Sequence, residues 1–146
     1  MLPPASSWRP SASMAQLRHR ALSLQRIRAF FIARGYLEVD TPCLSPDGIT
    51  DLYLTQLSTH CMGKRYYLQT SPEYYMKRLL AAGSGPIFQM THVFRGEERG
   101  RWHQPEFTLL EWYQLQPTLS LLLEEVDLFL QTMLGCPALT QQTYQA

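Results

Sequence analysis

The stretch from residue 94 to residue 113 concentrates charged and aromatic side chains at spacings that could serve a ligand. Arg95 and Glu97 stand two positions apart, so on a strand their side chains would point to the same face. A second alternating run would place four side chains together on one face of a strand: Phe107, Leu109, Glu111 and Tyr113. Because buried charges need partners, this pattern favours a binding face for a ligand that is itself charged, planar and amine-bearing.

A second group of candidate residues begins at position 71. Ser71 is a good N-cap residue, Pro72 suits the first helical position, and Glu73 stands in the first turn, so a helix start is predicted there. Complementarity with the helix dipole could alone explain Glu73. Glu111 has no such explanation, because it stands within an apolar strand pattern, and it is the stronger candidate for binding an ammonium group.

The elements that would carry these residues follow from apolar spacing and from turn residues. We predict helices over residues 13–34 and 71–83 and from 118 to a stop at 135–137, and strands over residues 37–40, 52–58, 65–70, 86–95 and 106–113. Residues 43–50 and 96–105 are expected to be loops, with a tight turn at 62–64. Ser13 and Gln16 have the spacing of a capping box at the start of the first helix. Since hairpins dominate, the predicted fold class is α+β, an antiparallel β-sheet flanked by helices.

Composition excludes several classes of protein. With 45% hydrophobic and 17% charged residues, the chain of 146 residues is typical of one globular domain, although residues 1–12 are Pro-rich and expected to be flexible. The net charge of +1 gives no general argument for nucleic-acid binding. The three cysteines are widely spaced, which favours free thiols, and the four histidines lack the spacing of ligands, so no metal site is predicted. The sequence contains no P-loop and no G-x-G-x-x-G after a strand, so a nucleotide would bind by other means than in a Rossmann fold.

Three segments in order resemble the catalytic domain of the class II aminoacyl-tRNA synthetases in its lysyl form. Residues 34–42, RGYLEVDTP, are similar to motif 1, and residues 94–113, FRGEERGRWHQPEFTLLEWY, are similar to motif 2. Residues 70–80, TSPEYYMKRLL, resemble the turn and helix that bind the amino acid. Together with SWRPSAS near the start, these segments most resemble the lysyl-tRNA synthetase paralogues that attach β-lysine to elongation factor P. The resemblance covers about residues 7–137.

The resemblance implies a ligase that activates lysine or β-lysine with ATP as an adenylate and transfers it to a lysine side chain of elongation factor P. Arg95 would be the catalytic residue, since a guanidinium stabilises charge that develops at the α-phosphate; an ion pair with a neighbouring glutamate is the alternative. The implied ATP-binding residues are Arg95, Gly96, Glu97, His103, Gln104 and Phe107. Phe107 would stack on adenine, or else be an ordinary core residue. Close relatives have Asn in place of Gly96 and of Gln104, which leaves Gly96 a backbone contact at best.

The implied substrate-binding residues are Ser71, Pro72, Glu73, Glu111 and Tyr113. Lysine and β-lysine carry two ammonium groups, and each needs a carboxylate within hydrogen-bond reach. Glu106, next to the loop, is expected to be structural. Mg²⁺ would be held by the phosphates and by residues outside this chain. The motif 1 region would form a homodimer, elongation factor P would be the acceptor in preference to tRNA, and no membrane partner is expected.

Motif 3, a Gly-rich element whose arginine binds ATP, is not found after Pro137. We therefore expect residues 13–146 to be the N-terminal part of a catalytic domain and this chain alone to be inactive. We expect no anticodon-binding domain before motif 1, which favours the protein-modifying branch. Two alternatives stay open: a piece of a genuine lysyl-tRNA synthetase, and a non-catalytic synthetase-like module that dimerises or regulates.

Residues 1–37 contain no Asp or Glu and carry several arginines, a composition that is also typical of a mitochondrial transit peptide. An ordinary first helix with a basic face is the favoured interpretation, because motif 1 continues directly from it. We expect the protein to be cytoplasmic.

Overall fold

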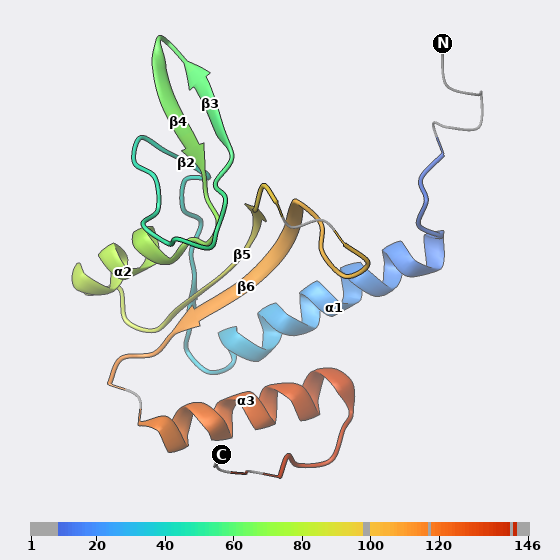
Figure 1. The fold of residues 1–146 in the computed structure, drawn as a ribbon. Coiled ribbons are helices and arrows are strands. Elements are labelled where there is room, and N and C mark those ends of the chain that lie inside the picture. The colour runs from blue at the N-terminus through green and yellow to red at the C-terminus, as the bar shows by residue number, and fades with distance from the viewer. Residues whose placement is uncertain (1–8, 98–99, 117, 141, 143–146) are drawn as a thin grey trace. The chain divides into compact units, whose positions relative to one another are not determined.

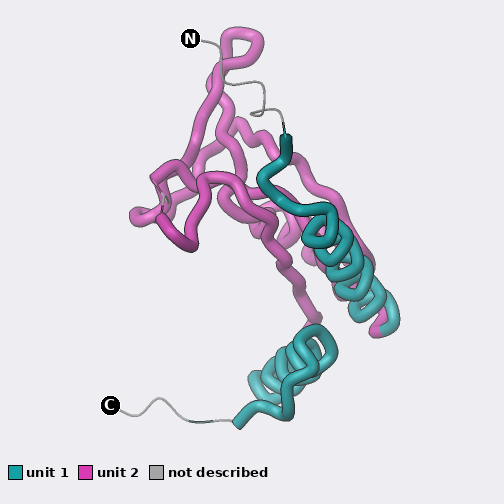
Figure 2. The backbone as a smooth tube through the Cα atoms, turned by 90° about the vertical axis from the view of Figure 1, so that its right-hand side faces the viewer, with its two compact units in different colours: residues 1–33, 117–146 teal, residues 34–116 magenta. Residues whose placement is uncertain are grey.

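The computed structural model describes residues 9–97, 100–116, 118–140 and 142 of the chain. The chain divides into two compact units, residues 1–33 with 117–146 and residues 34–116 (Figure 2). All candidate site residues belong to the second unit, which also contains both β-sheets. Residues 1–8, most of the segment predicted to be flexible, lie outside the described residues. No helix in the described part of the chain is long and apolar enough to cross a membrane.

The longer sheet has three strands in the order β1-β5-β6. Figure 1 labels two of them, β5 and β6, which lie side by side. β5 (Ile87–Phe94) and β6 (Glu106–Tyr113) pair antiparallel over their whole length, close to the predicted extents. β1 (Leu37–Glu38) pairs in parallel with the other edge of β5, and the chain between them forms the crossover that a parallel pair requires. The predicted α+β class, with mainly antiparallel pairing, is confirmed.

The smaller sheet has the order β2-β4-β3 and is antiparallel throughout. β3 (Ser58–Cys61) and β4 (Lys64–Leu68) form a hairpin joined by only Met62 and Gly63. Both residues have positive φ, 50° and 74°, as in a type I′ turn, whose twist matches that of the strands. The predicted turn at this position is confirmed.

The strand predicted over residues 52–58 is wrong, because β3 begins only at Ser58. Leu52 and Tyr53 are 91% and 93% exposed, so the apolar alternation there does not mark a buried face. Instead, the Asp51 carboxylate accepts the Tyr53 N–H at 2.9 Å and makes a turn. Conversely, β2 (Leu44–Ser45) lies where a loop was predicted. It is a strand because β4 offers it a pairing edge, which the local sequence does not reveal.

Helix α2 (Glu73–Ala81) is shorter than the predicted 71–83 by two residues at each end. At its start the Glu73 N–H donates to the Ser71 hydroxyl oxygen at 3.1 Å, so Ser71 acts as a cap although Pro72 occupies the N-cap position. At its end Gly83 adopts a positive φ of 87°, which terminates the helix at little steric cost. The capping contact fixes the Ser71 hydroxyl relative to the first turn of α2.

Gln69 joins the two sheets through both its backbone and its side chain. Its N–H donates to the Cys43 carbonyl at 2.9 Å, and its carbonyl accepts the Phe94 N–H at 2.9 Å. Its side-chain amide donates to the Thr91 hydroxyl at 3.1 Å and to the His92 carbonyl at 2.9 Å. The residue is only 6% exposed, so water cannot readily replace these bonds. Gln69 therefore fixes the end of β4 against β5.

The other unit contains α1 (Met14–Ile32) and α3 (Leu119–Leu134), both close to their predicted extents. The predicted capping box of α1 is confirmed: Ser13 N–H donates to Gln16 Oε1 at 2.7 Å, and Gln16 N–H donates to Ser13 Oγ at 3.2 Å. Three aromatic rings join the two helices: Phe30, Phe31 and Phe129.

Replacing Gln69 with alanine should destabilise the protein, because one buried and one partly buried acceptor on β5 would lose their donor. We expect the free energy of unfolding to fall by about 1–3 kcal/mol, the usual cost of leaving buried polar groups unsatisfied. Urea unfolding followed by circular dichroism measures this change. Gln114→Ala, at an exposed position, is the matched control and should change stability by less than about 0.5 kcal/mol. Equal effects of the two substitutions would contradict the role assigned to Gln69.

Candidate active site

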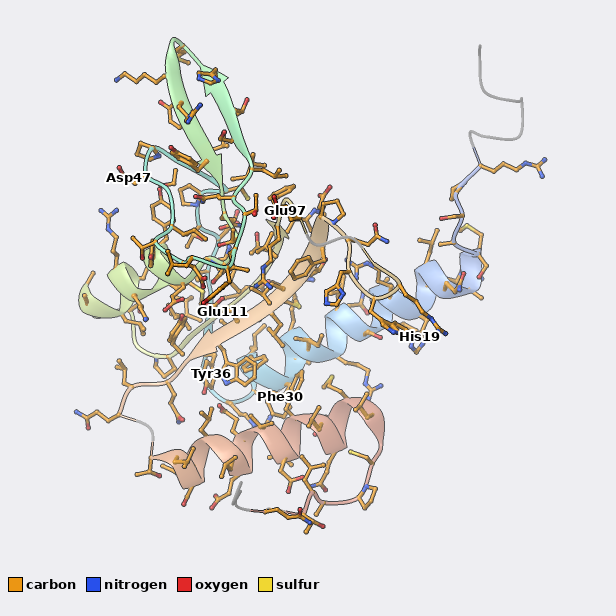
Figure 3. The ribbon with its side chains drawn as sticks, viewed as in Figure 1. His19, Phe30, Tyr36, Asp47, Glu97 and Glu111 are labelled. Atoms are coloured by element: carbon orange, nitrogen blue, oxygen red, sulfur yellow. The ribbon has the colours of Figure 1, made fainter. Side chains whose placement is uncertain are left out.

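The register of β5 with β6 determines which side chains share a face of the longer sheet. Directly opposed residues in an antiparallel pair point to the same side. Three such pairs are Val93 with Phe107, Gln89 with Glu111, and Ile87 with Tyr113. The prediction that four alternating residues of this strand share one face is therefore confirmed. Glu111 lies on β6 among them (Figure 3).

Glu111 is the centre of a hydrogen-bonded cluster on this face. Its Oε2 accepts the Ser71 hydroxyl at 2.6 Å, and its Oε1 accepts the Tyr113 hydroxyl at 2.5 Å. Both donors are neutral, so they satisfy the carboxylate oxygens without cancelling its charge. Within the described residues, no Lys, Arg or His forms a salt bridge with Glu111. The structure thus brings together three of the predicted substrate-binding residues around a half-buried negative charge.

Burial raises the pKa of Tyr113 well above the ordinary value of a tyrosine, and the hydrogen bond to Glu111 and the Glu111 charge raise it further. Ionisation of this phenol would place a second negative charge beside the carboxylate. The hydroxyl therefore stays protonated at any working pH and remains a donor to Glu111.

Glu73 lies in the first turn of α2 and forms an ion pair with Lys77, one helical turn further along. The hydrogen bond to Glu73 and the Glu73 charge raise the pKa of Lys77, and the charge of Glu111 adds a smaller effect. Both side chains of the pair are partly exposed. A ligand ammonium that approaches Glu73 would therefore exchange with the Lys77 ammonium instead of meeting an unpaired carboxylate.

A cavity of about 290 Å³ opens beside the start of α2. Its polar lining comes from the segment before β3 and from the start of the helix: Thr50, Asp51, Thr70, Ser71, Glu73 and Tyr74. This volume lies at the small end of ligand pockets and suits a molecule of amino-acid size. Pro72 is fully buried and has no N–H, so it can position its neighbours but cannot donate to a ligand.

Arg95 follows the last residue of β5 directly. Its N–H donates to the Pro105 carbonyl at 2.9 Å, which extends the ladder by one step. Its guanidinium carbon lies 5.2 Å from the centre of the Phe107 ring, within the range of a cation–π contact. The predicted catalytic arginine and the predicted adenine-stacking ring are therefore neighbours. Phe107 and Glu111 are four residues apart on one face, about 13 Å along the strand.

The prediction that Arg95 and Glu97 share a strand face is wrong, since β5 ends one residue before Arg95 and the chain then turns. The Gly96 N–H is already used, because it donates to the Thr55 carbonyl at 2.7 Å. A Cβ on Gly96 would stand 3.1 Å from side-chain atoms of both Leu57 and Thr55, so a larger residue would force these neighbours apart. Gly96 thus fastens the segment before β3 to the end of β5.

His103 and Gln104 are exposed in the loop between β5 and β6. Gly100 and His103 exchange backbone hydrogen bonds of 3.2 and 3.4 Å, which close a small turn. Glu97 is exposed near the loop end of the hairpin (Figure 3). No hydrogen bond among the described residues connects these three side chains with Arg95 or Phe107. Their roles in ATP binding stay predictions.

Glu106 lies on the opposite face of β6 from Glu111, since the two are an odd number of residues apart. Its Oε1 lies 2.9 Å from His92 Nδ1, and both side chains are largely exposed. This cross-strand contact gives the Glu106 carboxylate a partner within the protein, so no ligand is needed to explain its presence, as expected of a structural residue.

Sequence analysis missed several residues of the site. Asp51 and Tyr74 line the cavity, and the Thr50 hydroxyl lies 3.4 Å from the Tyr74 hydroxyl. The signal for Asp51 was a single carboxylate inside the apolar run ITDLYL. Gln89 is 1% exposed and directly opposite Glu111, and its signal was a glutamine next to the apolar residues at the start of this strand. Buried polar residues of this kind are uncommon unless they hold neighbours in place.

A family model described as tRNA synthetases class II (D, K and N) matches residues 5–133. The match spans α1, both sheets and nearly all of α3. The chain belongs to this family. It is therefore related to ligase-type enzymes that attach amino acids, which use ATP and Mg²⁺. The family model covers the members for aspartate (D), lysine (K) and asparagine (N) together, so the match does not identify which of these amino acids is the substrate.

Mg²⁺ in such enzymes neutralises phosphate charge when it is bound. Among the residues that the structure describes, no group of three or more His, Cys, Asp and Glu could hold a metal ion. These residues therefore do not fit a site in which the protein itself surrounds the ion, and we assign no step to it.

The raised pKa of Tyr113 predicts that this phenol does not ionise near pH 10, where ordinary tyrosines do. In a spectrophotometric titration at alkaline pH, the folded wild type and Tyr113→Phe should therefore show the same absorbance change near pH 10. A smaller change in Tyr113→Phe would contradict the assignment, because Tyr113 would then titrate as an exposed residue. Unfolding the wild type in denaturant should release the missing phenol to its ordinary pKa and serves as the control.

Proposed function

We propose that this protein is an ATP-dependent ligase that activates lysine or β-lysine as an adenylate and transfers the acyl group to a lysine side chain of elongation factor P. The observation that carries the proposal is Glu111, whose charge is held in place by the neutral hydroxyls of Ser71 and Tyr113. This carboxylate lies on a face that continues to Phe107, beside Arg95. The face therefore offers an anionic group at one end and a cation with an aromatic ring at the other.

The charge of this site favours lysine over the other amino acids of the family. An aspartate side chain would bring a further carboxylate toward Glu111 and Glu73, and like charges at short range repel. An asparagine side chain would offer only a neutral amide. A lysine or β-lysine ammonium would instead form charge-assisted hydrogen bonds, which are about twice as strong as neutral ones.

Arg95 and Phe107 would act in adenylate formation. An oxygen of the substrate carboxylate attacks the α-phosphorus of ATP, so that a new O–P bond forms and the bond to pyrophosphate breaks. The Arg95 guanidinium would stabilise the negative charge that develops on the phosphate oxygens. The Phe107 ring, in contact with Arg95, would offer its other surface to the adenine.

In the second step the ε-amine of the acceptor lysine attacks the acyl carbonyl, an amide forms, AMP leaves and the amine loses a proton. The adenylate is already activated, so correct positioning is sufficient without a protein nucleophile. Elongation factor P as acceptor is supported by the resemblance of residues 7–13, 70–80 and 105–113 to the β-lysylating branch. In this proposal the protein is a cytoplasmic homodimer that associates through the motif 1 region.

A lysyl-tRNA synthetase activity is the second candidate, since the family match includes the K members and the same adenylate could serve tRNA. A non-catalytic module that dimerises or regulates is the third. The charged and aromatic face argues for a functional site, since a site without function would not require a carboxylate at Glu111 that forms no salt bridge among the described residues.

Substrate choice can be measured with non-hydrolysable aminoacyl-adenylate analogues by isothermal titration calorimetry. The lysyl analogue should bind at least about tenfold more tightly than the aspartyl analogue, a difference of about 1.4 kcal/mol. Glu111→Gln should weaken the lysyl analogue by about 10- to 100-fold, because one charge-assisted bond is lost. Glu106→Gln makes the same change on the opposite face and is the matched control, expected to leave affinity unchanged. Equal affinity for both analogues would contradict lysine activation.

The acceptor can be tested separately by binding assays with purified elongation factor P and with unmodified lysine tRNA at physiological salt. Our proposal predicts binding of elongation factor P and little binding of tRNA, in keeping with the low net charge of +1. Preferential binding of tRNA would favour the synthetase alternative. Binding of neither acceptor, with no binding of the lysyl analogue, would favour the non-catalytic module.

A further inference from the structure

Asp51 is a carboxylate of the cavity beside α2 that neither the motifs nor the apolar pattern assigned to the site. It lines the same cavity as Glu73 and Ser71, from the opposite segment of the chain. The cavity wall includes two carboxylates and no lysine or arginine. A space of amino-acid size with acidic walls favours a cationic occupant.

The segment that carries Asp51 is held in a defined place. The Ile49 N–H donates to Gln56 Oε1 at 2.9 Å, and Gln56 Nε2 donates to the Leu68 carbonyl at 3.1 Å, which ties the segment to β4. The Thr55 carbonyl accepts an N–H from the end of β5 at 2.7 Å. The position of Asp51 is therefore set by both sheets, although the residue belongs to neither.

The Asp51 side chain is exposed, and its carboxylate makes a local contact. Its Oδ1 accepts the Tyr53 N–H at 2.9 Å, which shapes the local turn. Among the described residues no cation forms a salt bridge with Asp51, whereas Glu73 is paired with Lys77. A neutral residue such as asparagine would shape the same turn, so the turn alone does not account for an aspartate here.

We infer that Asp51 is a specificity-determining residue that binds one ammonium group of the substrate inside this cavity. The inference rests on the proposed function and deepens it: the site recognises a diamino acid through separate carboxylates for its two ammonium groups. Glu111 does not line the cavity but accepts a hydrogen bond from Ser71 of its wall, and it provides one of these carboxylates from the sheet. Asp51 provides the other from the segment before β3. A substrate with a single ammonium group would leave one carboxylate without its partner, which costs affinity.

Calorimetric titration of the protein with L-lysine and with (R)-β-lysine tests this inference. Asp51→Asn should raise the Kd of whichever amino acid binds by about 10- to 100-fold, the loss of one charge-assisted hydrogen bond. The asparagine oxygen can still accept the Tyr53 N–H, so the turn is retained. Asp51→Glu keeps the charge and should recover much of the affinity, which a purely structural role would not explain. Glu124→Gln also removes one carboxylate charge, on an exposed residue of α3 outside this cavity; it is the control and should bind like the wild type.

The outcomes separate the inference from the function on which it rests. If the wild type binds lysine or β-lysine and Asp51→Asn binds it equally well, the inference is overturned while the proposed function stands. If the wild type binds neither amino acid, the proposed function fails and the inference fails with it. A loss in Asp51→Asn that Asp51→Glu does not reverse would mean a steric role and would also overturn the inference.

Discussion

The arrangement of the candidate site depends on one buried side chain, Gln69. Its amide donates to two acceptors on β5 while its backbone bonds to both sheets, and all of this takes place away from water. The chain therefore leaves β4 at a fixed point, and Ser71 follows two residues later, at the start of α2. That geometry brings the Ser71 hydroxyl to Glu111 on β6. The substrate end of the site is thus a consequence of how the two sheets are joined.

A second principle is that the site holds its negative charge with neutral donors. Ser71 and Tyr113 satisfy the oxygens of Glu111, and the raised pKa of Tyr113 favours the protonated hydroxyl that donates to the carboxylate. The charge itself persists, so it attracts a cation that fits. At the other end of the same face, about 13 Å away by strand geometry, Arg95 supplies a positive charge beside an aromatic ring. This polarity matches a molecule with an ammonium at one end and a phosphate and a base at the other.

The sequence could predict those elements whose structure is determined by residues close together in the chain. The β5–β6 hairpin shows alternation, α1 shows a capping box, and the turn of the β3–β4 hairpin contains a glycine at a position of positive φ. The expected strand over 52–58 failed because its apolar residues are exposed, and β2 was missed because its pairing partner is distant in sequence. Ser71 and Glu111 were each predicted to bind substrate. Their hydrogen bond spans 40 residues and could not be seen without the fold.

The central claim is that Glu111 binds a substrate ammonium while the substrate carboxylate faces Arg95. A crystal structure of the protein with L-lysine bound would test it most directly. Our account predicts an ammonium nitrogen within about 3 Å of a Glu111 carboxylate oxygen, with the lysine carboxylate directed along the sheet face toward Arg95. A lysine bound in the reverse direction, or one that leaves Glu111 in contact with only Ser71 and Tyr113, would contradict it.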